Sequence, residues 1–302
     1  MKCFRPLQGY RVTEPGNDPY VTFKDKALKP TQHADPLELR CGQCIGCRIT
    51  KARHWAVRCV HEAQMHEENS FITLTYETEH LPTNASLRVE DWQEFMKRLR
   101  KSLYPKKIRF YMAGEYGHSE TEVNNIGRPH FHAIIFGHNF HEDRVVKRES
   151  PHKAYESPQL TKLWSKGIAE LSDMTLETAA YCAQYTVKKV TGDLAKDHYI
   201  RVDKTTGDFV TIKPEFSTQS RRPGIGKKWF DKYGADCDKG FVTVNGKKEP
   251  LPKFYERIMT EERAQQLENI QEQRRKNLRY QTRENLKGEE QNYIKRTRSI
   301  IR

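Results

Sequence analysis

Residues 128–136, Arg-Pro-His-Phe-His-Ala-Ile-Ile-Phe, constrain the fold more than any other segment of the chain. Side chains alternate between the two faces of a strand, so His130 and His132 share one face and Phe131 points to the other. The apolar residues that follow predict a strand in the middle of a sheet. Histidine pairs on strands are more often structural or exposed than metal-binding, but two imidazoles on one face of a central strand can bind one divalent cation.

Apolar periodicity places further elements on both sides of this strand. Strands are expected at residues 71–76, 108–113 and 168–171, and helices at residues 48–68, 91–103, 157–165 and 175–190. Thr175 is a candidate N-cap for the last of these helices. The order predicts an α+β fold with a central antiparallel sheet on a split βαβ, ferredoxin-like plan, and with helices on one or both faces.

Changes in composition along the chain predict four segments. They are an irregular, cysteine-containing N-terminal arm (1–48), the core (49–190), a basic extension expected to contact DNA (191–250) and a charged tail that is helical or disordered (251–302).

The chain is strongly basic, with 53 Lys and Arg against 40 Asp and Glu and a formal charge of +13. Such a charge favours a polyanionic partner, because neutralising phosphates releases counterions, although a basic solvated surface has the same composition. No apolar run reaches the length of a membrane-spanning helix, and no apolar region of a secretory signal follows the first residues. Membrane insertion and secretion are therefore not expected.

Glu115 is the first candidate for a third ligand beside His130 and His132, because it follows the strand expected at residues 108–113. Two histidines and one glutamate, with open positions left for substrate, form a catalytic metal arrangement. Imidazole ligands intrinsically favour Mn²⁺ or another transition metal over Mg²⁺, which would occupy the site through its abundance.

Tyr181, Tyr185 and Lys188 share one face of the helix expected at residues 175–190, because they are four and three residues apart. Tyrosines at this spacing usually belong to an amphipathic helix that packs on a sheet. The alternative is that the two phenols act as nucleophiles beside one metal. A phenol has a pKa near 10, so a metal at the phosphate and a cation such as Lys188 would be needed to lower the barrier.

Three motifs in this order, at residues 114–117, 127–132 and 181–188, resemble the HUH endonuclease superfamily. Within it the chain is most similar to the two-tyrosine rolling-circle replication initiators of microviruses, the gene A type. Residues 220–226 and 41–48 further resemble the gokushovirus branch, and the resemblance covers about residues 40–233.

The resemblance implies that His130, His132 and Glu115 hold Mn²⁺ or Mg²⁺, and that Tyr181 and Tyr185 are the nucleophiles. It implies a metal-dependent nick in single-stranded origin DNA through a 5′-phosphotyrosine, followed by rejoining that closes a circle. The chain has no P-loop, so a host helicase is expected to unwind the DNA and a host polymerase to extend the 3′-OH. A monomer that acts in the cytoplasm of a bacterial host is expected.

Cys41, Cys44 and Cys47, with Cys3 as a fourth candidate, could form a structural Zn²⁺ site. An iron–sulfur cluster also uses closely spaced cysteines, but the chain lacks the Cys-Pro that ends such runs. Free thiols in a tight glycine-containing turn before a helix are the third alternative.

A cluster after residue 220 combines positive charge with an aromatic surface and with glycines that let the backbone approach phosphate. Its candidate DNA-binding residues are Arg221, Arg222, Lys227, Lys228 and Trp229.

Two other functions are compatible with these residues. A plasmid initiator or a relaxase-like HUH enzyme would use the same chemistry, although paired tyrosines disfavour single-tyrosine transposases. A non-enzymatic, zinc-containing nucleic-acid-binding protein would bind DNA without forming an adduct, and would be indifferent to the loss of His130.

Overall fold

The computed structural model describes residues 3–23, 33–149, 153–190, 192–203, 205–276 and 282–301. In space the chain divides into two units. Unit 1 consists of Met1–Thr50 and Lys276–Arg302, and unit 2 consists of Lys51–Arg275.

A seven-stranded sheet forms the centre of unit 2, and each strand runs antiparallel to its neighbours. Across the sheet the strands are β12 (Phe216–Gln219), β5 (Arg109–His118), β6 (Ile126–Phe136), β4 (Asn69–Tyr76), β9 (Gly167–Asp173), β8 (Ala154–Glu156) and β7 (Val145–Arg148). β6 pairs with β5 along one edge and with β4 along the other. The expected antiparallel sheet, with the histidine strand inside it, is confirmed.

Strands β4 and β5 are joined by helix α2 (Val89–Ser102), and β6 lies between them, which makes a split βαβ unit. The apolar residues of α2 repeat at helical spacing and are buried, namely Trp92, Phe95, Met96 and Leu99. Phe131 of β6 contacts Trp92 and also Trp164 of α3 (Pro158–Trp164), with ring centroids 6.2 and 5.9 Å apart. The main hydrophobic core therefore lies between the sheet and these two helices.

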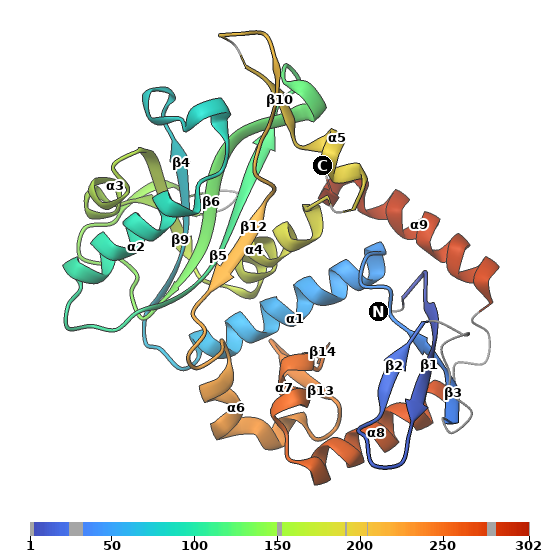
Figure 1. Ribbon diagram of the computed structural model, residues 1–302. Helices are drawn as coiled ribbons and strands as arrows, with labels where there is room; N and C mark the ends of the chain where they lie inside the picture. The colour runs from blue at the N-terminus through green and yellow to red at the C-terminus, as the bar shows by residue number, and fades with distance from the viewer. Residues whose placement is uncertain are drawn as a thin grey trace. The chain divides into compact units, whose positions relative to one another are not determined.

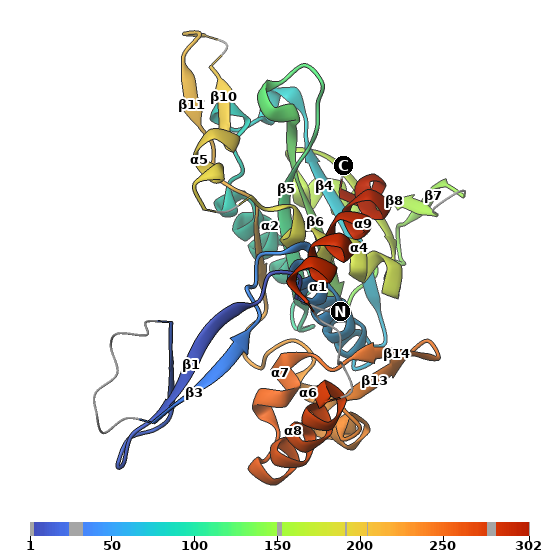
Figure 2. The same ribbon diagram turned by 90° about the vertical axis from the view of Figure 1, so that its right-hand side faces the viewer.

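Helices α1 (Ile45–Ala63) and α4 (Leu176–Lys188) cover the opposite face of the sheet (Figures 1 and 2). Trp55 of α1 packs on Tyr111 of β5 with ring centroids 4.9 Å apart. The residues of α4 that face the sheet are small and fully buried, namely Ala179, Cys182 and Ala183. The Cys182 thiol accordingly donates to the backbone oxygen of His132 at 3.5 Å. Small residues at this spacing let α4 lie close to the sheet.

A second, smaller core lies in unit 2 around Val57 of α1, Trp229 and Tyr255. The remaining strands of unit 2 form two-stranded pairs, β10 (Ile200–Val202) with β11 (Phe209–Thr211) and β13 (Phe241–Val244) with β14 (Lys247–Pro250). Its remaining helices are α5 (Leu194–His198), α6 (Lys227–Tyr233), α7 (Lys253–Ile258) and α8 (Glu261–Lys276).

Unit 1 contains a three-stranded sheet where the sequence predicts an irregular arm. Strand β1 (Leu7–Thr13) lies between β2 (Tyr20–Thr22) and β3 (His33–Leu39). Most side chains of this sheet are exposed, so the strands carry no apolar alternation that would reveal them, and β3 also contains Pro36. Unit 1 ends in helix α9 (Arg283–Ile301), which agrees with the helical alternative for the tail.

Among the described helices, none is both long enough and apolar enough to span a membrane.

Candidate active site

Glu115, His130 and His132 bring their side chains together on the face of the sheet that α4 covers. Glu115 of β5 lies directly opposite His130 of β6, and the ligand atoms of all three residues lie within 4.8 Å of one another. The sequence places Glu115 after the end of a strand, but β5 continues to His118 and Glu115 lies inside it. A rigid ladder rather than a loop therefore holds the carboxylate.

Glycine is needed at Gly127, near the start of β6. A Cβ atom there would lie 2.8 Å from the backbone oxygen of Gly117 on β5, closer than such atoms approach one another. The glycines that flank the glutamate and the histidines thus let the two backbones meet.

The hydrogen bonds of His130 indicate that a positive charge belongs between His130 and Glu115. Nδ1 of His130 lies 3.1 Å from the backbone oxygen of Arg128, which can only accept, so Nδ1 carries a hydrogen. Nε2 of His130 lies 2.7 Å from Oε1 of Glu115. A neutral imidazole would direct a lone pair at this carboxylate oxygen, so the contact requires a proton or a metal cation.

The Glu115 carboxylate also fits a metal ligand. The side chain is buried, and Oε2 has no hydrogen-bond partner among the described residues. Burial by itself raises the pKa of Glu115, but the hydrogen bonds with His130 and His132 outweigh it and lower the pKa below its ordinary value. Glu115 is therefore an anion at neutral pH, with one oxygen left to bind a cation.

Thr73 of β4 is a site residue that the motif comparison passes over. Its hydroxyl lies 2.9 Å from Nδ1 of His132, whose Nε2 is 3.2 Å from Glu115 Oε1. A hydrogen bond at one ring nitrogen fixes the orientation of the other. The sequence signal was available, because Thr73 alternates with the buried Ile72 and Leu74 and so belongs to the histidine face.

Replacing Thr73 with Val is expected to weaken metal binding or activity by about 10–100-fold, since the ring of His132 loses the group that orients it. The measurement is a titration of Mn²⁺ into the Thr73→Val protein. Thr243→Val makes the same chemical change on β13, at an exposed position, and should leave the titration unchanged. Equal curves for both variants would contradict the role given to Thr73.

Tyr181 places a phenol beside the histidine cluster. Thr175 caps α4 as expected, with its side chain accepting from the Thr178 amide. Tyr181 is 46% exposed, and its ring lies 5.1 Å from that of His132 and 6.1 Å from that of Phe71, edge-on in both cases. A half-exposed phenol next to this cluster can reach both the site and a substrate from solvent.

Tyr185 follows Tyr181 by one turn in α4, and Lys188 is the last residue of the helix. Their side chains lie outside the described part of the structure, so their proposed roles rest on backbone position alone.

The basic cluster lies at the far end of the sheet from the histidines. Its backbone follows β12, and Ser220 donates to the backbone oxygen of Phe110, near the start of β5. At about 3.4 Å per residue, β5 separates this end from Glu115 by about 20 Å. Arg221, Arg222 and Lys228 are exposed, whereas Lys227 pairs with Asp231.

Trp229 is a packing residue in the structure. Its ring is buried and stacks on His61 with centroids 3.5 Å apart, and it also stacks on Tyr255. The cations around it, rather than its ring, form the exposed surface of the cluster.

Glu62 of α1 connects this loop to the sheet. Its buried carboxylate accepts from Arg109 of β5 and, at 2.7 Å, from the Gly226 amide. Burial raises the pKa of Glu62, but the donors His66, Gly226 and Arg109 together lower it. Arg109 also donates to the backbone oxygen of Pro223 at 2.6 Å.

Replacing Glu62 with Ala is expected to lower the free energy of unfolding by about 3–5 kcal/mol, because it leaves the largely buried Arg109 without its carboxylate. Urea unfolding followed by circular dichroism measures the change. Glu67→Ala removes an exposed carboxylate from the same stretch of chain and should change stability by less than about 0.5 kcal/mol. A loss below about 1 kcal/mol for Glu62→Ala would show that this connection contributes little.

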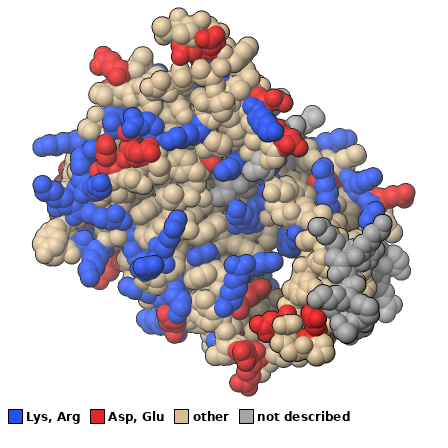
Figure 3. Space-filling model, viewed as in Figure 1, with Lys and Arg blue, Asp and Glu red and all other residues tan. Residues whose placement is uncertain are grey.

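Positive charge is not confined to the loop after residue 220. Lys and Arg also gather on the left of the view in Figure 3, where α2 lies in Figure 1, and α2 carries Lys97, Arg98, Arg100 and Lys101. Because α2 covers the face of the sheet opposite the histidines, net charge alone does not locate a nucleic-acid surface.

The four cysteines Cys3, Cys41, Cys44 and Cys47 form a second cluster, in unit 1, and their Sγ atoms also lie within 4.8 Å of one another. Both this cluster and the Glu115–His130–His132 cluster could bind a metal ion.

Comparison with known proteins identifies relatives of the chain. A family model for replication-associated proteins of the ORF2 type matches residues 69–190, which include the histidine cluster and all of α4. The chain is 32% identical to the replication-associated protein VP4 of Bdellovibrio phage phiMH2K, over 85% of this chain and 76% of that protein. It is 29% identical to the replication-associated protein ORF2 of Spiroplasma virus 4, over 91% and 86% of the two chains. No solved structure matches.

Proposed function

Because the chain belongs to the family of phage replication-associated proteins, we propose that it initiates rolling-circle replication by nicking single-stranded origin DNA. The observation that carries the proposal is the position of Tyr181. Its half-exposed phenol lies beside His132, in a cluster whose carboxylate and imidazoles suit a divalent cation.

Glu115, His130 and His132 are proposed to hold Mn²⁺ or Mg²⁺. The buried oxygen of Glu115 that lacks a partner, and the contact between His130 Nε2 and Glu115, both fit a cation at this position. When bound, such an ion acts as a Lewis acid that polarises the scissile phosphate.

The Tyr181 hydroxyl is proposed to attack the phosphorus of one phosphodiester. A bond forms between the phenolic oxygen and phosphorus, and the bond from phosphorus to the 3′ oxygen breaks. The phenol loses its proton, and the departing 3′ oxygen gains one. One phosphodiester replaces another, so the linkage retains the energy needed for rejoining without ATP.

Tyr185, one helical turn away, is proposed as the second nucleophile. It would cut the regenerated origin while the new 3′-OH attacks the linkage on Tyr181, which closes a circle. The free 3′-OH left by the first cut would prime a host polymerase, and a host helicase would unwind the duplex in the bacterial cytoplasm.

The exposed cations Arg221, Arg222 and Lys228 are proposed to hold the strand on one side of the cut. Their distance of about 20 Å from Glu115 along β5 suits contacts to flanking phosphates and not to the scissile one.

The experiment incubates the protein and Mn²⁺ with single-stranded oligonucleotides that tile the circular genome encoding the chain. A covalent adduct should form with one of them, and mass spectrometry of tryptic peptides should find the linked nucleotide on Tyr181 or Tyr185. DNA binding without an adduct in Mn²⁺ or Mg²⁺ would instead support the non-enzymatic alternative.

A further inference from the structure

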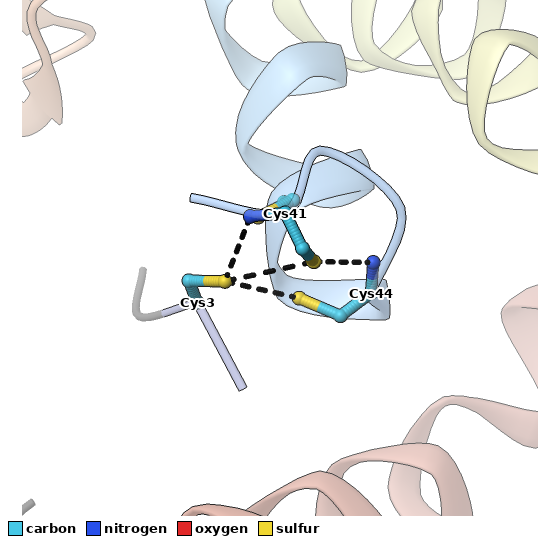
Figure 4. Close-up of side chains that lie close together, drawn as sticks. Cys3, Cys41 and Cys44 are labelled. Atoms are coloured by element: carbon cyan, nitrogen blue, oxygen red, sulfur yellow. Dashed lines mark hydrogen bonds between the residues drawn. The ribbon is translucent and has the colours of Figure 1, made fainter. Parts of the chain in front are cut away.

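The cysteine cluster of unit 1 has the geometry of a mononuclear metal site. The Sγ atom of Cys3 lies 3.6 Å from that of Cys41 and 3.8 Å from that of Cys44, and these side chains point toward one another (Figure 4). Four thiolates around one Zn²⁺, each about 2.3 Å from the ion, lie about 3.8 Å apart in a tetrahedron. Disulfide sulfurs would be only about 2.05 Å apart. The cysteines of an iron–sulfur cluster bind separate irons, which places their sulfurs further from one another.

The backbone around the cluster favours thiolates. Amide groups donate to three of the sulfurs at 3.3 Å each, from Phe4 to Cys44, from Cys41 to Cys3 and from Cys44 to Cys41. Donors of this kind stabilise the charged form of sulfur. The turn between Cys41 and Cys44 is possible because Gly42 adopts a φ of +74°, which other residues rarely adopt.

Helix α1 adds to the same effect. Cys44 immediately precedes α1 and Cys47 lies in its first turn, where the helix dipole favours negative charge and where no acidic residue competes. Burial alone raises the pKa of Cys44, but the amides of Phe4 and Cys47 outweigh it and lower that pKa to about 7.

The C-terminal helix packs on this cluster. Leu286 of α9 is buried against Phe4, Cys44 and Cys47. Arg5 forms an ion pair of 2.9 Å with Glu290 of α9, whose side chain is almost fully buried. Two of the four buried apolar residues of this small core are themselves cysteines, so little other apolar surface holds α9 in place. Cores this small usually need a metal or a disulfide, and none of these cysteines is in a disulfide.

We propose that Cys3, Cys41, Cys44 and Cys47 bind one Zn²⁺, and that this zinc site creates the surface on which α9 docks. The ion joins the first residues of the chain to the beginning of α1. Phe4 and Arg5, which immediately follow Cys3, are thereby held where Leu286 and Glu290 contact them. The inference concerns unit 1 alone and does not depend on the proposed nicking activity.

The first experiment measures zinc in the full-length protein after dialysis against Mg²⁺, with Cys3→Ser as the test variant. Wild type should retain one zinc per chain, and Cys3→Ser less than one-tenth of that. Cys237→Ser, which alters a buried cysteine of unit 2, should retain the full amount. Cobalt substituted for zinc should give the intense visible absorption of a tetrahedral thiolate site in wild type, but not in Cys3→Ser. Zinc retained by Cys3→Ser but lost in His132→Ala, or iron in place of zinc, would overturn the assignment.

The second experiment tests the docking of α9 by limited trypsin digestion. Removing zinc with a chelator, or introducing Cys3→Ser, should speed cleavage at Lys287 at least tenfold. Leu286→Ala should speed the same cleavage while zinc remains bound, which separates docking from metal binding. An unchanged cleavage rate in the zinc-free protein would overturn the proposed role of the site.

Discussion

Replacing Tyr181 and Tyr185 together with Phe is expected to abolish the covalent protein–DNA adduct, with a loss of at least about 10⁴-fold in its rate of formation. The change removes both phenolic oxygens and keeps both rings, so Tyr181 keeps its packing against His132 and Phe71. The adduct carries the 5′ phosphate of the downstream fragment. An oligonucleotide labelled at its 3′ end therefore transfers the label to protein, and a denaturing gel measures the transfer.

The two single variants separate cutting from joining. Each retains one phenol and should still cut, but neither can complete the exchange that closes a circle. Tyr104→Phe removes the hydroxyl of an 85% exposed tyrosine and should behave as wild type in both assays. Label transfer that survives in the double variant would assign the nucleophile to another residue and refute the mechanism proposed for α4.

Replacing His132 with Ala is expected to lower the single-turnover rate of adduct formation by about 10²–10³-fold, the range found when one group that stabilises transition-state charge is removed. His132 is buried between Thr73 and Glu115, so its loss removes one donor to a bound cation and one hydrogen bond to the carboxylate. Rates are measured over a range of Mn²⁺ concentrations, and DNA affinity is measured alongside by fluorescence anisotropy.

DNA affinity should remain within about twofold of wild type in His132→Ala, because the exposed cations that are proposed to bind phosphate are unchanged. His141→Ala provides the matched control, since His141 is exposed and contacts Asn139 and Glu68 instead of the cluster. A His132→Ala protein that forms the adduct at the wild-type rate would show that the cluster has no part in the chemistry.

The elements that hold the site could be predicted because their signals are local. The alternation around His130 and His132 predicts β6, and the cap at Thr175 with the apolar period after it predicts α4. The position of Glu115 was less accessible, since Gly114 and Gly117 lower strand propensity and suggest a loop. Pairing with β6 on one side of β5 and with β12 on the other overrides that propensity.

Burial set by distant parts of the chain could not be predicted from local pattern. Trp229 follows two lysines and resembles an exposed stacking surface, yet His61 and Tyr255, which are remote in sequence, bury its ring. The same limit applies to the cysteines. Their spacing allows zinc, an iron–sulfur cluster or free thiols, and only the separation of the sulfurs favours one of these.

The position of β6 between β5 and β4 also determines when the geometry of the site is established. A strand paired on both edges and covered on both faces loses its arrangement only when the whole unit unfolds. Glu115, His130 and His132 are thus aligned during folding, before any DNA arrives, so substrate binding energy is not consumed in ordering them. Preorganisation of this kind lets a short strand of nucleic acid, with few contacts of its own, find the ligands already in register.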